Sequence, residues 1–362
     1  MKIGILTYYG VHNHGALLQA NALKTVLESK GHDCGFLEFK RDYSNIGEEQ
    51  SKKYEIGLGS ILFYTKYLFN KGVSNIFFNL KKKSILEDYR SSHIPMLGAY
   101  DTFNGDLIII GSDEVFSLEI GINPFLYGNS LNSKHIGSYA GCFGPTTFDE
   151  IKELNQVEMI SSGLNKMDAI SVRDMNSQKV IENLIGVDVP IVCDPVILYG
   201  YKEEMNRFNP KEEKYILIYS YDKNMNERIE YDPILKYAES NGLKIFSIGY
   251  HHKWCKSINV TPDELLGWIN HAELVITDTF HGTVMSIICN TPVAIKLRGN
   301  HNKLKFLLME YNLLDRTLES FKQLNEVAAN KINFNEVNKK INERRKFSMD
   351  YLDSLLEKCN KS

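Results

Sequence analysis

Residues 273–287, ELVITDTFHGTVMSI, constrain the fold of this chain more than any other stretch. Residues 274–276 form an unbroken apolar run, which is typical of a strand buried on both faces of a parallel sheet. The apolar spacing that follows Gly282 predicts a helix that packs back on this sheet. Residues 278–281 therefore fall at the carboxyl end of a strand, which is the edge where open α/β sheets bind their ligands.

The same loop carries side chains that suit chemistry on an anion. Backbone N–H groups that open a helix favour negative charge, and a glycine allows close approach to the backbone. We therefore expect Thr279, Phe280 and Gly282 to contact an anionic ligand, the donor of a transferred group. His281 can move a proton near neutral pH or hold a charged oxygen. The alternative is a helix-capping turn in which His281 only completes a hydrogen bond.

A second loop of this kind follows the first predicted strand, residues 2–8. Asn13 and His14 fall at its carboxyl end, and Gly15 opens a helix predicted over residues 15–28. We predict that these three residues face a ligand. The GxGxxG spacing is absent, so the loop is not a dinucleotide fingerprint. Turn formation by Asn and Gly is the alternative interpretation.

A third loop follows the buried strand predicted at residues 107–110. Ser112 is small enough to admit a ligand, and Asp113 or Glu114 could accept hydrogen bonds from sugar hydroxyls or act as a base. Helix capping by Ser112 or Asp113 is the alternative and is compatible with such a role. The segment KHIGSYAGCFG also runs from a strand into small residues. Tyr139, at the end of that strand, is a further candidate for binding the sugar hydroxyls.

Two groups of basic side chains lie where these loops are expected. Arg173 follows a short strand predicted over residues 170–172 and begins a helix, the end at which a cation gains nothing from the helix dipole. Its planar guanidinium suits a phosphate or carboxylate, with an ion pair to Asp174 or Asp194 as the alternative.

A last predicted strand is followed by Lys296, Arg298, His301 and Lys303. We expect Lys296, Arg298 and Lys303 to hold the anionic groups of the donor. Solvated loop charge is the alternative.

The chain of 362 residues suits two α/β domains. A βαβ pattern opens the chain, and strands alternate with helices again after residues 200–213, which are charged, contain a proline and are predicted as a linker. We predict a first domain at residues 1–200 and a second at residues 201–334 that carries the His281 loop. A final helix is expected over residues 335–362.

Composition excludes several classes of function. Lysine and arginine total 42 against 45 acidic residues, a net charge of −3, so no basic field for nucleic acid is expected. Six scattered cysteines form no CxxC pair and no metal-ligand spacing, which predicts reduced thiols and no metal site. The chain shows no leader and no apolar run long enough to span a bilayer, so we expect a cytoplasmic protein.

Residues 44–94 are predicted to be a helical insertion in the first domain. Aromatic residues and lysines mix over residues 60–84, a composition that suits peripheral contact with the inner face of a membrane. The alternative is a pair of amphipathic helices that packs on the sheet.

Taken together, these stretches resemble the polysaccharide pyruvyl transferase family, and they occur in the family's order over nearly the whole chain. The matching residues are Asn13, Gly15, Ala16, Gln19, Gly111, Ser112, Asp113, Ser138, Tyr139, Ala140, Arg173, Asp194, Pro195, Thr277, Asp278, His281 and Gly282. Two positions depart from the pattern. Relatives commonly have an arginine where this chain has Thr279, and a loop that usually reads GSDQVW reads GSDEVF here, with Glu114 and Phe116.

The resemblance implies two Rossmann-like domains that face a cleft, similar to glycosyltransferases of the B type, with the last helix returning to the first domain. It implies transfer of pyruvate from phosphoenolpyruvate, as co-substrate without a further cofactor, to hydroxyls of a lipid-linked or nucleotide-linked sugar. We expect His281 to move protons, Arg173 and the 296–303 group to hold the donor, and Asp113 or Glu114 to touch the acceptor.

Two other functions remain open from the sequence. The same cleft suits a glycosyltransferase with a nucleotide-sugar donor, in which Arg298 and Lys303 would bind a diphosphate. Thr279, in place of the usual arginine, also suits a relative that binds sugars without turnover.

Overall fold

The computed structural model describes residues 1–40, 73–212, 214–299 and 302–361. The first lobe is built on a five-stranded sheet in the order β3-β2-β1-β4-β5, in which all neighbouring strands are parallel. The strands are β1 (Lys2–Leu6), β2 (Asp33–Glu38), β3 (Met96–Ala99), β4 (Leu107–Ile110) and β5 (His135–Ser138). The apolar run at residues 107–110 therefore predicted β4 correctly.

The second lobe repeats this design with a parallel sheet in the order β10-β9-β6-β7-β8. Its strands are β6 (Tyr215–Tyr219), β7 (Lys244–Ile248), β8 (Lys256–Ile258), β9 (Leu274–Thr277) and β10 (Val293–Ile295). The expected α/β class with two Rossmann-like sheets is confirmed. The two sheets fall on either side of residue 200, while the domain boundary itself stays a prediction.

Helices of the first lobe cover both faces of its sheet. They are α1 (His14–Ser29), α4 (Val73–His93), α5 (Phe148–Glu153), α6 (Val157–Leu164), α7 (Met175–Ile185) and α8 (Pro195–Tyr199), with short 3-10 turns at Leu118–Ile120 and Pro124–Tyr127. The insertion predicted at residues 44–94 is described from residue 73 onward, as α4. The rest of it, and most of the predicted membrane contact at residues 60–84, lies outside the described residues.

The second lobe and the chain end supply the remaining helices. They are α9 (Lys202–Arg207), α10 (Arg228–Asn241), α11 (Pro262–Asn270), α12 (Phe280–Ile288), α13 (Asn302–Glu310), α14 (Leu324–Ala329) and α15 (Phe334–Lys361), with 3-10 turns at Leu314–Arg316 and Phe321–Gln323. Thr261 caps α11 and Pro262 occupies its first position, where a hydroxyl side chain and a proline are each favoured.

Three local predictions differ from the structure. The strand expected at residues 170–172 is reduced to isolated bridges, because Val172 pairs only once with Gly141 and once with Ile191. Asp194-Pro195, a dipeptide that favours a turn, instead opens the short helix α8, with the Asp194 carboxylate accepting from the N–H of Val196. The expected linker at residues 200–213 contains α9, which packs on α11. Each difference involves a short segment whose neighbours, not its own pattern, decide its form.

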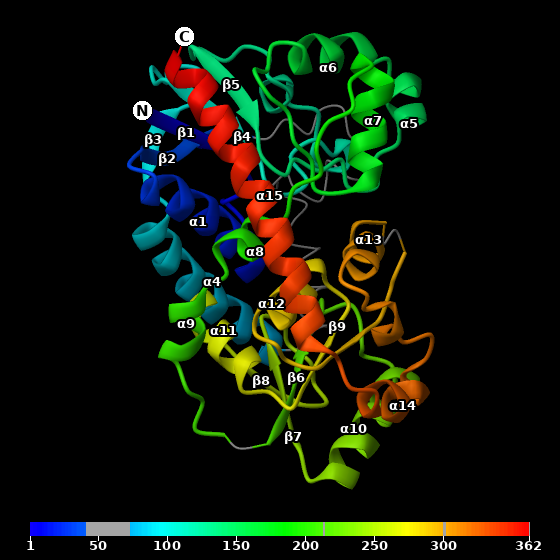
Figure 1. Cartoon of the computed structure of the whole chain (residues 1–362). Helices are drawn as coiled ribbons and strands as arrows, with labels where there is room; N and C mark the ends of the chain where they lie inside the picture. The colour runs from blue at the N-terminus through cyan, green and yellow to red at the C-terminus, as the bar shows by residue number, and fades with distance from the viewer. Residues whose placement is uncertain (41–72, 213, 300–301, 362) are drawn as a thin grey trace.

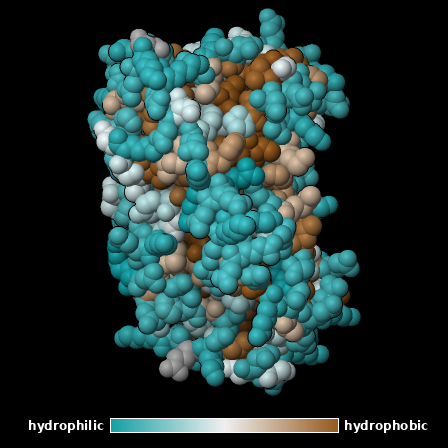
Figure 2. All heavy atoms as spheres, in the orientation of Figure 1, coloured by the Kyte–Doolittle hydropathy of each residue, from teal (hydrophilic) through white to brown (hydrophobic). Residues whose placement is uncertain are grey.

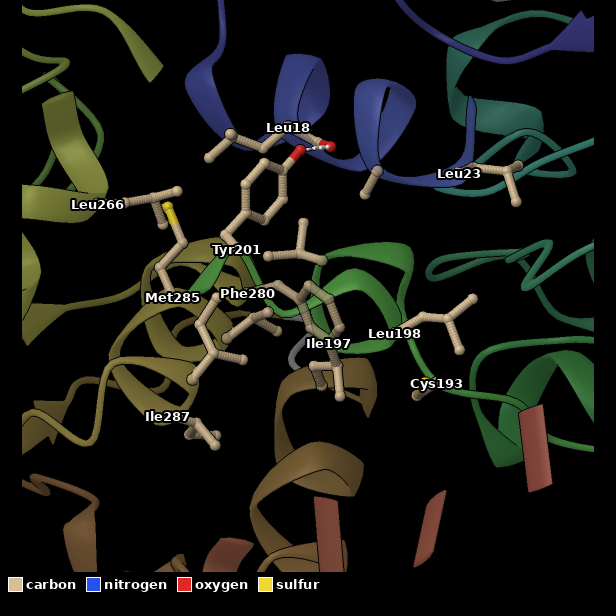
Figure 3. Close-up of a cluster of buried hydrophobic side chains, with 14 of the residues drawn as sticks. Leu18, Leu23, Cys193, Ile197, Leu198, Tyr201, Leu266, Phe280, Met285 and Ile287 are labelled. Atoms are coloured by element: carbon tan, nitrogen blue, oxygen red, sulfur yellow. Dashed lines mark hydrogen bonds between the residues drawn. The ribbon is translucent and has the colours of Figure 1, made fainter. Parts of the chain in front are cut away.

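One apolar cluster joins the two lobes. Side chains alternate along β1 and β6, so that Ile3 and Ile5 of β1 and Leu217 of β6 belong to the same cluster, while Ile216 faces the outer layer of the second lobe. Figure 3 shows the centre of this seam, where α1, α8 and α12 meet and the Tyr201 hydroxyl donates to the Leu18 carbonyl. The lobes are therefore packed on each other behind any cleft.

The helix α15 crosses from the second lobe to the first (Figure 1). Its Ser348 hydroxyl accepts from the Cys193 N–H at 2.9 Å, and its Tyr351 hydroxyl donates to the Ser138 carbonyl of β5 at 2.8 Å. These contacts attach α15 to the first lobe.

The helix α4 also contacts both lobes. The Tyr89 hydroxyl donates to Asp263 of α11 at 3.0 Å, and the Lys82 ammonium lies 4.3 Å from the ring centroid of Tyr250. Hydrophilic side chains cover most of the face in Figure 2, with apolar residues gathered in its upper half. Among the described residues, no helix has the length and apolar character that crossing a bilayer requires.

Candidate active site

A cavity of about 560 Å³ lies where the carboxyl ends of the two sheets face each other. The first lobe contributes the N-terminus of α1 and the loop after β4, and the second lobe contributes the loops after β6, β9 and β10. The lining residues are Asn13, Ala16, Asp113, Glu114, Glu119, Pro145, Tyr219, Tyr221, Lys223, Asn224, Asp278, Thr279, Phe280, His281, Arg298, Gly299, Lys303 and Leu304. Most of these are polar, so the cavity suits a charged or hydroxylated ligand.

The loop after β9 is held rigidly at the start of α12. The Thr279 hydroxyl accepts from the Gly282 N–H at 2.9 Å and caps the helix. A Cβ on Gly282 would lie 2.3 Å from the Thr277 hydroxyl oxygen, so only glycine permits this close turn. The cap fixes the direction of the next side chains, Phe280 and His281, which both line the cavity.

His281 lies at the junction of the two lobes. A Cβ on Gly15 would come within 2.4 Å of the Cβ and Cγ atoms of His281, so the N-termini of α1 and α12 meet at this point. The Nε2 atom of His281 is buried, and it lies 3.6 Å from Oδ2 of Asp194. This separation is long for a hydrogen bond, so the interaction is mainly electrostatic.

Asp194 links His281 to Arg173. The same Oδ2 atom accepts from Nη1 of Arg173 at 2.8 Å, and Nη2 of Arg173 donates to Asp113 at 3.2 Å. Burial opposes ionisation of Asp194, yet His281 and Arg173 hold the pKa of this carboxyl well below its usual value. Burial likewise opposes ionisation of Asp113, and Arg173 outweighs it and lowers the pKa of Asp113. Both carboxylates are therefore charged at neutral pH.

A second ion pair spans the cavity from lobe to lobe. Nζ of Lys303, on α13, lies 2.6 Å from Oε1 of Glu114, in the loop after β4. Burial alone would lower the pKa of Lys303, and the neighbouring Glu114 raises it instead. Phe280 lies between the two cationic groups, with Arg173 4.4 Å and Lys303 5.7 Å from its ring centroid.

Besides the two glycines Gly15 and Gly282, five predicted residues do not line the cavity. His14 is buried with Nε2 3.0 Å from the Val260 carbonyl, Ser112 donates to Gln19, and Tyr139 donates to the Cys193 carbonyl. Lys296 donates to the carbonyls of Leu318 and Glu319. Arg173 lies behind the lining, and its terminal nitrogens contact the carboxylates of Asp113 and Asp194. Of the two ion-pair partners considered from the sequence, Asp194 is the one observed, because Asp174 caps α7. The structure thus places these five residues in the support of the site.

Sequence reasoning missed the contribution of β6. Tyr219, Tyr221 and Asn224 line the cavity, because the carboxyl end of β6 lies next to that of β9. The strand-end rule that selected the other loops would also have selected these residues. Asp278 was noted in the motif without a role, and the structure places its side chain, fully buried, in the cavity wall.

Among the described residues, one group of side chains has the spacing of metal ligands. His135, Asp168 and Cys359 place their ligand atoms within 4.8 Å of one another, and none of them lines the cavity.

The two lobes and the cavity at their facing edges define an α/β protein with a glycosyltransferase B-type architecture. S. aureus MnaA in its UDP complex has a TM-score of 0.51 at 12% identity, over 93% of this chain and 90% of that one. Trehalose-6-phosphate synthase OtsA has a TM-score of 0.52 at 8% identity, over 98% and 99%. UDP-N-acetylglucosamine 2-epimerase from Rickettsia bellii has a TM-score of 0.50 at 12% identity, over 99% and 96%.

The chain belongs to the polysaccharide pyruvyl transferase family, whose sequence profile matches residues 13–295. The family resemblance of the motifs is thereby confirmed, and the matched region reaches from the N-terminus of α1 to the end of β10. Comparison with curated protein sequences gave no significant match. At these low identities, the similar structures establish the fold alone.

Proposed function

We propose that this protein transfers pyruvate from phosphoenolpyruvate to two hydroxyls of a sugar and forms a ketal, during synthesis of a capsule, exopolysaccharide or cell-wall polymer. The observation that carries the proposal is the meeting of His281 from one lobe and Arg173 from the other on a single carboxylate, Asp194, beside a polar cavity. The reaction would take place in the cytoplasm, where phosphoenolpyruvate is made.

The donor's anionic groups have a binding site at the meeting point of two helix N-termini. The N-termini of α1 and α12 each carry a partial positive charge, and they converge beside Gly15 and His281, although Asn13 and Thr279 cap N–H groups of these first turns. Lys303 adds a full charge from the other wall. Its carboxylate partner Glu114 holds it in place until a phosphate or carboxylate of the donor competes for the ammonium group.

Arg173 can act on the donor in two ways. Its contact with Asp113 is the longer of its two ion pairs, at 3.2 Å, so a donor carboxylate would compete there first. Its contact with Asp194 keeps that carboxylate charged beside the imidazole. Arg173 therefore supports His281 even where it does not touch the substrate.

The proton transfers are assigned to His281. Ketal formation adds one proton to the methylene carbon of phosphoenolpyruvate, joins two sugar oxygens to its central carbon and releases phosphate with the second proton. Because Nε2 is buried toward Asp194, we assign the exchange with substrate to Nδ1. Asp194 stabilises the imidazolium that forms when the histidine removes a hydroxyl proton.

A glycosyltransferase reaction with a nucleotide-sugar donor is the second candidate. It is favoured by the fold shared with MnaA, whose structure contains UDP. The two reactions differ in their products, since one releases inorganic phosphate and the other a nucleoside diphosphate. A binding protein without turnover, the third candidate, would release neither.

The test is phosphate release from phosphoenolpyruvate in the presence of lipid-linked and nucleotide-linked sugars, with mass spectrometry of the products. We expect sugar-dependent phosphate release and a product heavier by the pyruvyl group. His281→Ala should lower turnover by roughly 10²-fold or more. The matched control is His271→Ala, on an exposed histidine at the end of α11, which should keep the wild-type rate. An unchanged rate in His281→Ala would remove this histidine from the mechanism.

A further inference from the structure

The second lobe's wall of the cavity holds a set of polar side chains that the donor site does not use. We call it the aspartate subsite, formed by Tyr221, Asn224, Glu230, Asp278 and Arg298. Four of these line the cavity, and Glu230 supports them from behind. They come from the end of β6, the start of α10, the end of β9 and the segment after β10, so the fold alone brings them together.

Asp278 is the centre of this subsite. Its Oδ2 atom accepts from Nδ2 of Asn224 at 2.7 Å and from Nε of Arg298 at 2.8 Å. Its side chain is fully buried from solvent, and its Oδ1 atom has no hydrogen-bond partner among the residues that the structure describes. A buried carboxylate oxygen without a partner is costly, so this atom is suited to accept a hydrogen bond from a ligand in the cavity.

The local charges select the class of ligand. Arg298 lies 2.8 Å from both Asp278 and Glu230, so two carboxylates surround one guanidinium; these three side chains have a net charge of −1, which Lys223 on the same wall offsets. The two carboxylates beside Arg298 disfavour a phosphate or carboxylate at this guanidinium, and the guanidinium between the acids disfavours a metal ion. A neutral ligand with hydroxyl groups fits, because hydroxyls can donate to Oδ1 of Asp278.

Tyr221 supplies the apolar surface that a sugar ring needs. It is 40% exposed in the cavity wall, and its ring lies 5.2 Å from that of Tyr250 in an edge-on contact that holds it in place. An aromatic ring beside hydrogen-bonding side chains combines an apolar face with polar partners. Asp278 is three residues before His281, so a ligand bound here would share the cavity with the imidazole.

We propose that the aspartate subsite binds the acceptor sugar, with Oδ1 of Asp278 accepting from a ring hydroxyl and the ring lying against Tyr221. This inference rests on the proposed pyruvyl transfer for the identity of the acceptor. It moves Arg298 from the predicted donor group to the acceptor side and leaves Lys303 as the donor's cation.

The experiment measures sugar and donor binding separately. Methyl glycosides of galactose, glucose and N-acetylmannosamine are tested as probes by saturation-transfer NMR and titration, and phosphoenolpyruvate is tested by calorimetry. The first variant is Asp278→Asn, which keeps the shape of the side chain and removes its charge. The second is Tyr221→Ala, at a half-exposed position where a substitution should preserve the fold even if Asp278→Asn does not. The control is Glu227→Gln, an exposed acid at the start of α10 that makes no capping bond.

We expect wild type and Glu227→Gln to bind at least one glycoside, and both test variants to bind it about 10- to 100-fold more weakly. Phosphoenolpyruvate affinity should stay within about twofold. Unchanged glycoside affinity in both variants, loss of phosphoenolpyruvate affinity alone, or no glycoside binding by wild type would each overturn the subsite. Failure of the pyruvyl-transfer proposal would appear instead as absence of phosphate release while glycoside binding persists.

Discussion

At Gly15, a single absent methyl group allows α1 to lie against His281. Alanine normally stabilises a helix by up to about 1 kcal/mol relative to glycine, so a Gly15→Ala change would be harmless in an isolated α1. In this fold the new Cβ would come within 2.4 Å of two His281 carbons, the Cβ atom and the ring atom Cγ. The steric conflict therefore falls on the imidazole that the mechanism uses.

We predict that Gly15→Ala lowers turnover by about 10²-fold through displacement of His281. Steady-state kinetics of phosphate release, together with circular dichroism of the variant, would measure this effect. Gly10→Ala is the control, since a Cβ at Gly10 meets no atom within 4 Å. Wild-type turnover in Gly15→Ala would show that the contact does not position the histidine.

The buried side chain of His14 makes the packing of α1, and so the stability of the fold, depend on pH. It joins α1 to the segment before α11 through Nε2 and the Val260 carbonyl. Burial, with a smaller effect of Lys82, lowers the pKa of His14 to about 3. In the unfolded chain the pKa of a histidine is about 6.5. Between this pH and the lower pKa of the folded state, the imidazole is therefore protonated in the unfolded chain and neutral in the folded protein.

We predict that stability falls as the pH drops below about 6.5, because the unfolded state then binds more protons than the folded state. The contribution of His14 should be about 2 kcal/mol lost by pH 5, from about 1.4 kcal/mol per pH unit. Thermal unfolding of wild type and His14→Gln between pH 7 and 5 measures this difference. Equal pH dependence in the two proteins would contradict the assignment.

A hydrogen bond from the segment before α8 attaches the helix α15 to the first lobe. The Ser348 hydroxyl is fully buried and accepts from the N–H of Cys193, the residue before Asp194. We predict that Ser348→Ala lowers the free energy of unfolding by about 1–3 kcal/mol, because a buried N–H loses its partner.

Urea unfolding measures the effect of Ser348→Ala. Ser354→Ala is its control on the same helix, since that hydroxyl is exposed and, among the described residues, bonds only to the carbonyl of Asp350. The control should change stability by less than about 0.5 kcal/mol. A similar loss in both variants would mean that the contact with Cys193 is not responsible, because the higher helix propensity of alanine would by itself stabilise both.

For the whole molecule, the apolar seam between the sheets limits domain motion. The cluster that includes Ile5 of β1 and Leu217 of β6 is continuous across the lobes, and both α4 and α15 cross from one lobe to the other. Opening the cavity by moving the lobes apart would expose this apolar surface to water. Ligand exchange therefore requires side-chain and loop movement more than domain closure.

We predict that small-angle scattering profiles superimpose with and without phosphoenolpyruvate at saturation. The same samples should show a higher unfolding temperature with the ligand, since binding to the folded state adds stability. The rise in unfolding temperature serves as the control for binding. A resolvable decrease in the radius of gyration together with that rise would show that the lobes close.

Local pattern was enough to locate most elements of this fold. The unbroken apolar runs at β4 and β9 depend on neighbours along the chain, and both strands were predicted correctly. Short segments such as residues 170–172 and 195–199 carry too few residues for a period to be read, so their form could not be predicted in this way.

The sequence by itself determined the two parallel sheets, the family and the loops that reach the cavity, because strand periodicity and motif order are properties of the chain. Only the tertiary structure decided which loop residues face the ligand. In the folded protein the side chains of His14 and Tyr139 are buried in the core, and those of Tyr221 and Asn224 line the cavity. Asp194 connects His281 to Arg173. The reason is physical, since the direction of a loop side chain depends on the surfaces packed around it, and these surfaces come from distant parts of the chain.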